Sequence, residues 1–263
     1  MPETRLKYVA ELSPRLLERF QANILNWYRI HGRDLPWRRT RDPYAIVVSE
    51  IMLHQTQVRT VLPVYEAFMK TFPTVAALAA ADLSEVKRLT DPLGYKIRGT
   101  WLHLIAKTVV EEWHGDFPHS VESLSTLPGV GRYTAGAIVS FAFEEKAPIL
   151  DTNVNRFLGR FFGVDYQTSR AESRHQLWAL AEAVVPGDQV HAFNQALMDL
   201  GATICTSRKP SCLTCPVYAD CRKGGPQRPL NLAAEESAVY RVRHPKPQKA
   251  PKSRGNRGKS PRP

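Results

Sequence analysis

Apolar side chains recur every three or four positions through most of residues 10–205, which is the spacing of one buried helix face. No segment shows a convincing alternation of apolar and polar residues, so we predict an all-α fold. Pro and Gly separate the helical segments, and Asp82 and Ser120 stand where N-caps are expected. The clearest apolar series are Leu16, Leu17, Phe20, Ile24 and Trp27, and then Val58, Val61, Leu62, Tyr65 and Phe68.

The periodicity ends after Cys221, and Gly, Pro, Lys, Arg and Ser dominate residues 245–263. Such a segment cannot bury enough apolar surface to fold, so we predict that residues 223–263 form a basic, disordered tail. The tail also accounts for most of the net charge of +11, because nine of the 36 Lys and Arg residues lie from Arg241 onward, without one Asp or Glu. The other 27 nearly balance the 25 acidic residues, so charge alone is weak evidence for a nucleic-acid partner.

The chain has no run of 18 apolar residues, and its first residues lack the basic-then-apolar pattern of a signal peptide. We therefore expect no membrane partner and a reducing, cytoplasmic compartment. With 263 residues, 43% of them hydrophobic, the chain can bury a sizeable core as one large domain or two small ones.

All four cysteines lie within 17 residues, with the spacing C-x6-C-x2-C-x5-C. Four thiolates this close can converge on one centre, and soft thiolates favour zinc or an iron–sulfur cluster. Zinc usually takes two close pairs of cysteines, so the six-residue gap fits it poorly, and two local disulfides are the remaining alternative. The candidate ligands are Cys205, Cys212, Cys215 and Cys221.

The string LPGVGRYTA at residues 127–135 joins two predicted helices through a glycine-rich turn. Gly129 and Gly131 permit a tight turn and close backbone approach, and the second helix begins with unpaired N–H groups. A helix start of this kind suits an anion such as a DNA phosphate, although an ordinary corner between helices has the same pattern.

Two carboxylates are candidates for catalysis. Asp151 follows three apolar residues and is either a helix N-cap or a group that stabilises a sugar cation. Glu50 lies in an otherwise apolar helical run, where burial raises a carboxyl pKa toward that of a general acid at neutral pH. A structural pairing of Glu50 with Arg38 or Arg39 is the alternative.

These motifs together resemble the MutY-type adenine DNA glycosylases of the helix-hairpin-helix (endonuclease III) superfamily, over about residues 15–222. The cysteine spacing resembles that family's [4Fe-4S] loop, and LPGVGRYTA resembles its hairpin. The runs SEIMLHQTQV, LGY and FNQALMDLG are similar to its pocket, wedge and pre-cluster segments. The segment Asp91-Pro92 departs from the pattern, because the family more often has a glycine before LGY.

The resemblance implies a role for each matching residue. Glu50 would protonate a departing adenine, Asp151 would stabilise the sugar cation, and Asn153 would orient Asp151. Gln55 would fill the gap left in the base stack, and Tyr95 would enter the stack beside the orphan base. The other DNA-binding positions would be Trp37, Arg38, His54 and Gln195 in the pocket, with Gly129, Val130 and Gly131 in the hairpin.

Tyr133 stands where bifunctional relatives carry a Schiff-base lysine, and a phenol cannot form that imine. The sequence therefore predicts a monofunctional glycosylase that uses water and has no lyase activity. The expected substrate is adenine opposite 8-oxoguanine or guanine in double-stranded DNA, bound by a monomer.

The expected architecture is two-lobed. Residues 1–29 with 144–222 would form the cluster lobe, and residues 30–143 would form a six-helix lobe with the hairpin. Only about 40 residues follow Cys221, too few for the second domain that usually reads 8-oxoguanine in this family. Thymine/uracil·G mismatch glycosylases, which end just after the cluster, are therefore the first alternative. A non-catalytic DNA-binding module and a zinc-bound structural adaptor are the others.

Overall fold

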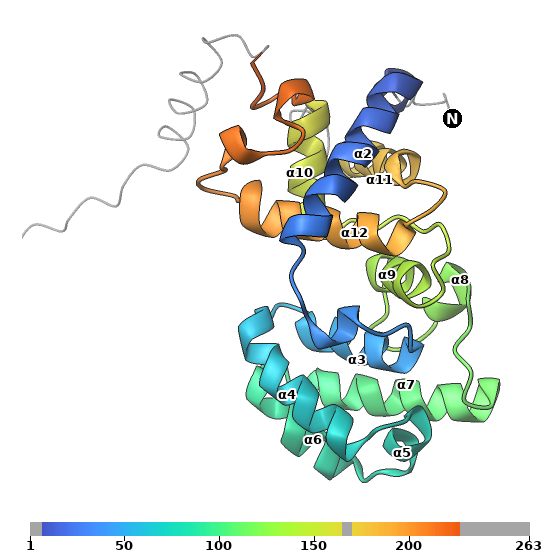
Figure 1. Ribbon diagram of the computed structural model, residues 1–263. Coiled ribbons are helices and arrows are strands. Elements are labelled where there is room, and N and C mark those ends of the chain that lie inside the picture. The colour runs from blue at the N-terminus through green and yellow to red at the C-terminus, as the bar shows by residue number, and fades with distance from the viewer. Residues whose placement is uncertain (1–6, 165–169, 227–263) are drawn as a thin grey trace, which may run out of the picture. The chain divides into compact units, whose positions relative to one another are not determined.

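The computed structural model describes residues 7–164 and 170–226, and all regular structure in these ranges is helical, as predicted (Figure 1). They belong to a compact unit, Met1–Pro226, which includes residues 223–226 of the predicted tail, whereas the rest of that tail, residues 227–263, lies outside the described residues. The longer helices are α2 (Pro14–His31), α3 (Pro43–Leu53), α4 (Val58–Thr71), α6 (Leu83–Thr90), α7 (Ile97–Trp113), α9 (Arg132–Ala142), α10 (Thr152–Phe162), α11 (Arg170–Val184) and α12 (Val190–Asp199). The shorter ones are α1 (Lys7–Ala10), η1 (Pro36–Arg38), α5 (Val75–Ala80), η2 (Asp91–Leu93), α8 (Val121–Leu124), η3 (Leu200–Ile204), η4 (Cys212–Thr214) and η5 (Tyr218–Asp220).

Helices α3 and α9 form the centre of the unit. Every residue of α3 from Tyr44 to Met52 is buried, and so is every residue of α9 from Thr134 to Ala142. The two helices pack against each other, while α3 also contacts α4 and α7, and α9 also contacts α8 and α12. Because apolar neighbours surround both helices, neither has a polar face. A carboxylate on α3 is therefore placed in the interior of the protein.

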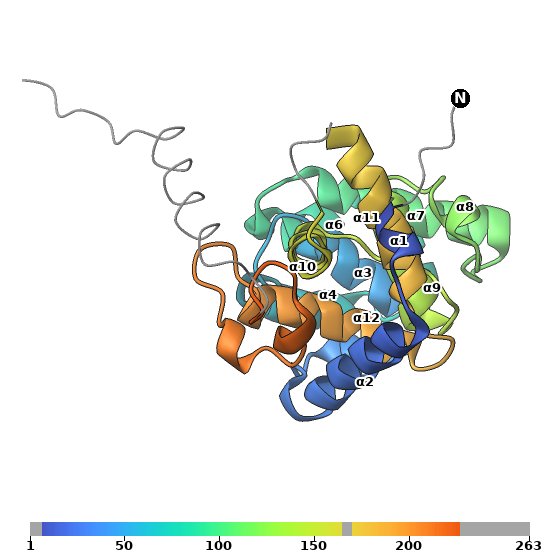
Figure 2. The same ribbon diagram turned by 90° about the horizontal axis from the view of Figure 1, so that it is seen from above.

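A cluster of aromatic rings joins α2 to α10 and α12. Phe20 of α2 lies 4.6 Å from Phe161 and 6.2 Å from Phe193, measured between ring centroids. Helix α2 runs beside α12 in both views (Figure 2). The apolar series predicted around Phe20 is thus a buried helix face. Through this face α2 packs against helices that come much later in the sequence.

Side-chain caps fix several helix starts. Ser120 accepts a hydrogen bond from the Ser123 N–H at the start of α8, which confirms the predicted cap. Asp82 stands at the N-cap position of α6, but its side chain accepts no capping bond. The backbone carbonyl of Asp82 instead accepts hydrogen bonds from the N–H groups of Glu85 and Val86, which closes the first turn.

Among the described helices, α3 contacts α9, α9 contacts α12, and α12 contacts α2. The bounds of the two expected lobes stay a prediction. Within the described ranges, no helix is both long and apolar enough to cross a membrane.

Candidate functional site

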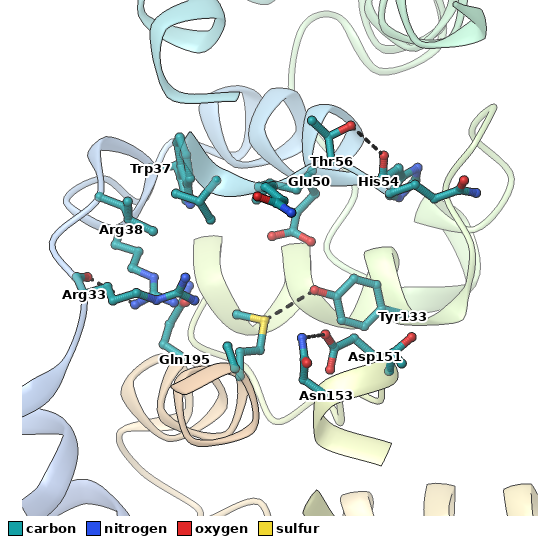
Figure 3. A pocket seen from close by; sticks show the side chains of 18 of the residues that line it. Arg33, Trp37, Arg38, Glu50, His54, Thr56, Tyr133, Asp151, Asn153 and Gln195 are labelled. Atoms are coloured by element: carbon teal, nitrogen blue, oxygen red, sulfur yellow. Dashed lines mark hydrogen bonds between the residues drawn. The ribbon is translucent and has the colours of Figure 1, made fainter. Parts of the chain in front are cut away.

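A cavity of about 980 Å³ lies where η1, α3, α9 and α12 meet the loop before α10 (Figure 3). Its interior end holds Glu50, Tyr133 and Asp151, and its mouth holds Gln55 and Tyr95. Ten of the residues predicted for catalysis or DNA binding line this one cavity, although they come from distant parts of the chain. They are Trp37, Arg38, Glu50, His54, Gln55, Tyr95, Tyr133, Asp151, Asn153 and Gln195.

Glu50 lies on α3 in the interior, with 4% of its surface exposed. Burial raises the pKa of Glu50 to about 7, the charge of Asp151 adds to the rise, and Tyr133 and Arg38 oppose it. The side chain therefore holds a proton over part of the neutral range. Glu50 forms no ion pair with Arg38 or Arg39, because these arginines pair with Asp199 and Asp34.

Asp151 is the N-cap of α10 and accepts a hydrogen bond from the Val154 N–H at 2.7 Å. The side-chain amide of Asn153 donates to the other carboxylate oxygen at 3.0 Å. Burial raises the pKa of Asp151, and these hydrogen bonds oppose the rise by stabilising the charged form. Asp151 is thus a helix cap, one of the two expected roles, and its carboxylate also lines the cavity.

Tyr133 is on the first turn of α9 and lies between the carboxyl groups of Glu50 and Asp151 (Figure 3). Its hydroxyl donates to the Met198 sulfur at 3.4 Å and lies within interaction range of Glu50. Burial, followed by the charges of Glu50 and Asp151, holds the pKa of Tyr133 well above its usual value. The phenol is therefore neutral, and its hydroxyl can donate a hydrogen bond at this point between the two acids.

A buried ion network forms one wall of the cavity. Both terminal nitrogens of Arg38 donate to Asp199 at 2.8 Å, and the Arg33 side chain donates to the same carboxylate at 2.7 Å. Burial opposes ionisation of Asp199, but the two arginines outweigh it and lower its pKa. Asp199 thus occupies both terminal nitrogens of Arg38, whose Nε has no partner in the described part of the chain, and the Arg38 charge opposes the rise of the Glu50 pKa.

Gln195 and Trp37 complete the inner pocket. The amide of Gln195 is 2% exposed, and in the described part of the chain its oxygen has no hydrogen-bond partner. Trp37 is 4% exposed and packs edge-on against Tyr65 at 5.0 Å. A planar ligand in the pocket would therefore meet one free amide acceptor and an apolar wall.

The mouth of the cavity carries two exposed side chains on turns. Gln55 follows α3 with φ 55°, a left-handed conformation that costs a residue with a side chain. Tyr95 is 48% exposed and meets Trp101 edge-on at 5.5 Å. His54 contacts the same indole, and burial followed by the charge of Arg98 lowers the pKa of His54, so its ring is neutral.

Of the predicted phosphate hairpin, Tyr133 lines the cavity, whereas the turn residues Gly129, Val130 and Gly131 do not. Gly129 has φ 75° and lies so close to Trp101 that an added Cβ would be 2.5 Å from the indole. Gly131 is the N-cap of α9, and no side chain caps this helix. Val130 is 4% exposed, and its N–H donates to the Leu127 carbonyl. The free first turn of α9 remains the candidate anion site.

The four cysteines form no disulfide, and the sulfurs of two of them lie beside Gly224. A Cβ on Gly224 would lie 3.1 Å from the Cys212 sulfur and 3.8 Å from the Cys221 sulfur. Burial raises the pKa of Cys215 to about 11, and the charges of the other three thiols add to the rise, so the four lie within electrostatic reach. Among residues 7–164 and 170–226, no three His, Cys, Asp or Glu side chains assemble a single-ion site.

N–H donors around these sulfurs suit thiolates. Arg160 donates to the Cys205 sulfur at 3.5 Å, and the Gly224 N–H donates to the Cys221 sulfur at 3.4 Å. Arg156 donates to the Cys205 carbonyl at 2.8 Å and to Asn153 at 2.9 Å. The donor set therefore fits a thiolate-bound cluster, and hydrogen bonds connect its loop to the partner of Asp151.

Several residues of the site were not predicted. Asp199, Arg33, Trp101 and Met198 line or close the cavity through contacts between distant helices. Asp199 lies within the recognised run FNQALMDLG, so an acid in an apolar helix was the available signal. No comparable signal marked Trp101, because a tryptophan on a helix is more often a core residue.

Comparison with known proteins gives a family. The family described as HhH-GPD superfamily base excision DNA repair protein matches residues 48–183. Adenine DNA glycosylase of Homo sapiens is 46% identical over 212 residues, which are 77% of this chain and 39% of that protein. The chain covers 41% of the corresponding proteins of Rattus norvegicus and Mus musculus, so it spans about two fifths of these curated relatives.

Other relatives are matched over nearly their whole length. Thymine-DNA glycosylase of Aeropyrum pernix is 39% identical over 209 residues, 78% of this chain and 94% of that protein. The solved structure of a thermostable thymine-DNA glycosylase has a TM-score of 0.72 at 34% identity, with 78% of this chain and 94% of that chain covered. An endonuclease III–DNA complex has a TM-score of 0.68 at 21% identity, covering 81% of this chain and 97% of that one, which supports the fold alone.

Proposed function

This chain belongs to the HhH-GPD superfamily of base excision DNA repair proteins, and we propose that it is a monofunctional DNA glycosylase that removes adenine mispaired with 8-oxoguanine or guanine. The observation that carries the proposal is the buried Glu50, whose pKa is raised to about 7, facing Tyr133 and Asp151 across one cavity. An acid that is protonated near neutral pH and a nearby carboxylate are the two groups that cleavage of an N-glycosidic bond needs.

The base is a poor leaving group as an anion, so it must gain a proton as its bond to the sugar breaks. Glu50 supplies this proton to a ring nitrogen of the purine and becomes a carboxylate. The hydroxyl of Tyr133 then donates to that carboxylate and stabilises it. The Gln195 amide, buried and with a free acceptor, is placed to bind a polar edge of the base.

The sugar left behind has the character of an oxocarbenium ion. Asp151 stabilises this positive charge, with Asn153 and the Val154 N–H fixing its carboxylate. Water adds its oxygen to C1′ and releases a proton, and the product is an abasic site with an intact backbone. The phenol at position 133 offers no amine for an imine, so strand cleavage requires added alkali.

DNA would approach along the cavity mouth and the hairpin. The first turn of α9 offers N–H groups to a phosphate, and the exposed Tyr95 and Gln55 face the space that a flipped nucleotide leaves. Solved relatives named as endonuclease III–DNA complexes share the fold, which supports duplex DNA as the partner. The cysteine loop would hold a [4Fe-4S] cluster that fixes residues 205–221 against α10.

A second function has specific observations in its favour. The thymine-DNA glycosylase of Aeropyrum pernix is 39% identical over 209 residues, and the solved thermostable thymine-DNA glycosylase has a TM-score of 0.72 at 34% identity. The same acid pair would then serve a pyrimidine opposite guanine.

Single-turnover excision on duplexes carrying A·8-oxoG, A·G, T·G and U·G decides between the two functions. We expect the adenine duplexes to react faster and to be cut only after hot alkali. Faster release of thymine or uracil than of either adenine would assign the mismatch function. Strand cleavage without alkali would refute the monofunctional mechanism.

A further inference from the structure

Arg98 on α7 is buried at the cavity mouth and has no part in the chemistry proposed above. Its residue exposure is 1%, which places it among the largest fully buried side chains. Its hydrogen-bond acceptors in the described part of the chain are all uncharged oxygens. Burying a guanidinium without a carboxylate partner is costly, so its position needs a reason.

The acceptors of Arg98 belong to two different turns. One terminal nitrogen donates to the Leu93 carbonyl at 3.1 Å, in the turn before Tyr95. The other donates to the His54 carbonyl and to the Thr56 hydroxyl, the latter at 2.6 Å. The planar fork therefore joins the two turns, and the Thr56 hydroxyl adds a direct contact of 3.4 Å to the Leu93 carbonyl.

Each of these turns presents one exposed side chain in an unusual backbone setting. Gln55 has φ 55° between the two acceptor residues of its turn, and Gly94, with φ 81°, precedes Tyr95. The guanidinium also lies 5.6 Å from the centre of the Tyr95 ring. The left-handed Gln55 persists only where its surroundings hold it, and Arg98 hydrogen-bonds both its turn and the turn before Tyr95.

We infer that Arg98 is a positioning residue that links the Gln55 turn to the Tyr95 turn, so that the two side chains engage a distorted duplex as one unit. The inference rests on the proposed function only in placing DNA at the cavity mouth. It assigns Arg98 no contact with the base, the sugar or the acid pair. Loss of Arg98 should uncouple the contributions of Gln55 and Tyr95 to binding.

The test is a double-mutant cycle on binding to a duplex with a tetrahydrofuran abasic-site analogue opposite guanine. Dissociation constants are measured by fluorescence anisotropy for the full chain, Gln55→Ala, Tyr95→Ala and the double variant. We expect the double variant to differ from the product of the single effects by about threefold or more. In an Arg98→Met background, we expect the product to hold within about twofold.

Two further backgrounds keep the test decisive. Thr56→Val removes only the hydroxyl that joins the turns, so it should reduce the coupling even if Arg98→Met folds poorly. Arg88→Met makes the same change at an exposed arginine of α6 and should leave the coupling intact. Additive effects in the unmodified chain, or unchanged coupling in both test backgrounds, would overturn the inference. Because no base is excised, the result does not depend on which base the enzyme removes.

Discussion

Glu50 shows how the position of one residue sets its chemistry. The same carboxyl on a helix surface would be ionised at neutral pH, but the apolar surroundings of α3 raise its pKa to about 7. Tyr133 and Arg38 keep the rise from going further. Glu50 is thus balanced between its acid and its anionic form near the working pH.

The rate of excision should therefore depend on pH in a defined direction. A general acid acts in its protonated form, so the single-turnover rate should fall as pH rises through about 7. Glu50→Gln should lower the rate strongly and remove this limb, whereas the exposed Glu66→Gln should leave the profile unchanged. A wild-type rate that stays constant through pH 7 would exclude Glu50 as the acid.

Asp199 should matter for stability more than for chemistry. Replacing it with Asn leaves Arg38 buried without its counter-charge, so we expect a loss of about 3–5 kcal/mol in the free energy of unfolding. Asp34→Asn breaks a similar pair with Arg39 at the exposed surface and should change stability little. Urea titrations of the two variants measure the difference. Equal effects of the two substitutions would mean that the buried network adds no more stability than the exposed pair.

At the scale of elements, the cysteine loop depends on what it binds. Residues 205–221 contain only two one-turn helices, and their side chains are mostly outside the apolar core. A bound cluster would supply the stability that such a short loop cannot obtain from packing.

Cys212→Ser should lower the iron and sulfide content per chain and abolish the visible absorbance of the purified protein. The neighbouring Ser211→Ala keeps all four thiols and should retain both. Stoichiometric zinc in place of iron and sulfide in the unmodified chain would contradict the cluster and favour the structural zinc site.

Helix positions were predictable because amphipathic spacing is local, and the Phe20 series and the Ser120 cap show this. The buried helices α3 and α9 were recognised through motifs instead, since a helix buried on all sides has no periodic polar face. Pairings such as Arg38 with Asp199 span 161 positions, and no local pattern encodes them. The sequence likewise carries no sign that both terminal nitrogens of Arg38, which is expected to bind DNA, donate to Asp199.

At the scale of the whole molecule, the charge lies mostly in one segment. Nine Lys and Arg residues lie from position 241 onward, outside the described residues, while the rest of the chain is nearly balanced. Charges of this kind contact phosphates without reading the sequence of bases.

Deleting residues 241–263 should weaken binding to every duplex alike and leave the choice of base unchanged. Each lost phosphate contact should reduce the slope of log K against log salt concentration by about 0.9. A tail of equal length with Gln in place of Lys and Arg should behave like the deletion, which separates charge from length. A change in which mispair is cut would make the segment a specificity element.

We propose above all that the cavity between α3, α9 and α10 is a base-excision site with Asp151 as its essential anion. The most direct test is Asp151→Asn, because asparagine preserves the N-cap of α10 and removes only the charge. Excision of adenine opposite 8-oxoguanine and binding to the same duplex are measured together, with the exposed Asp188→Asn as the control. We expect excision to be abolished while binding stays within a few-fold of the unmodified chain. Near-wild-type excision by Asp151→Asn would contradict the claim.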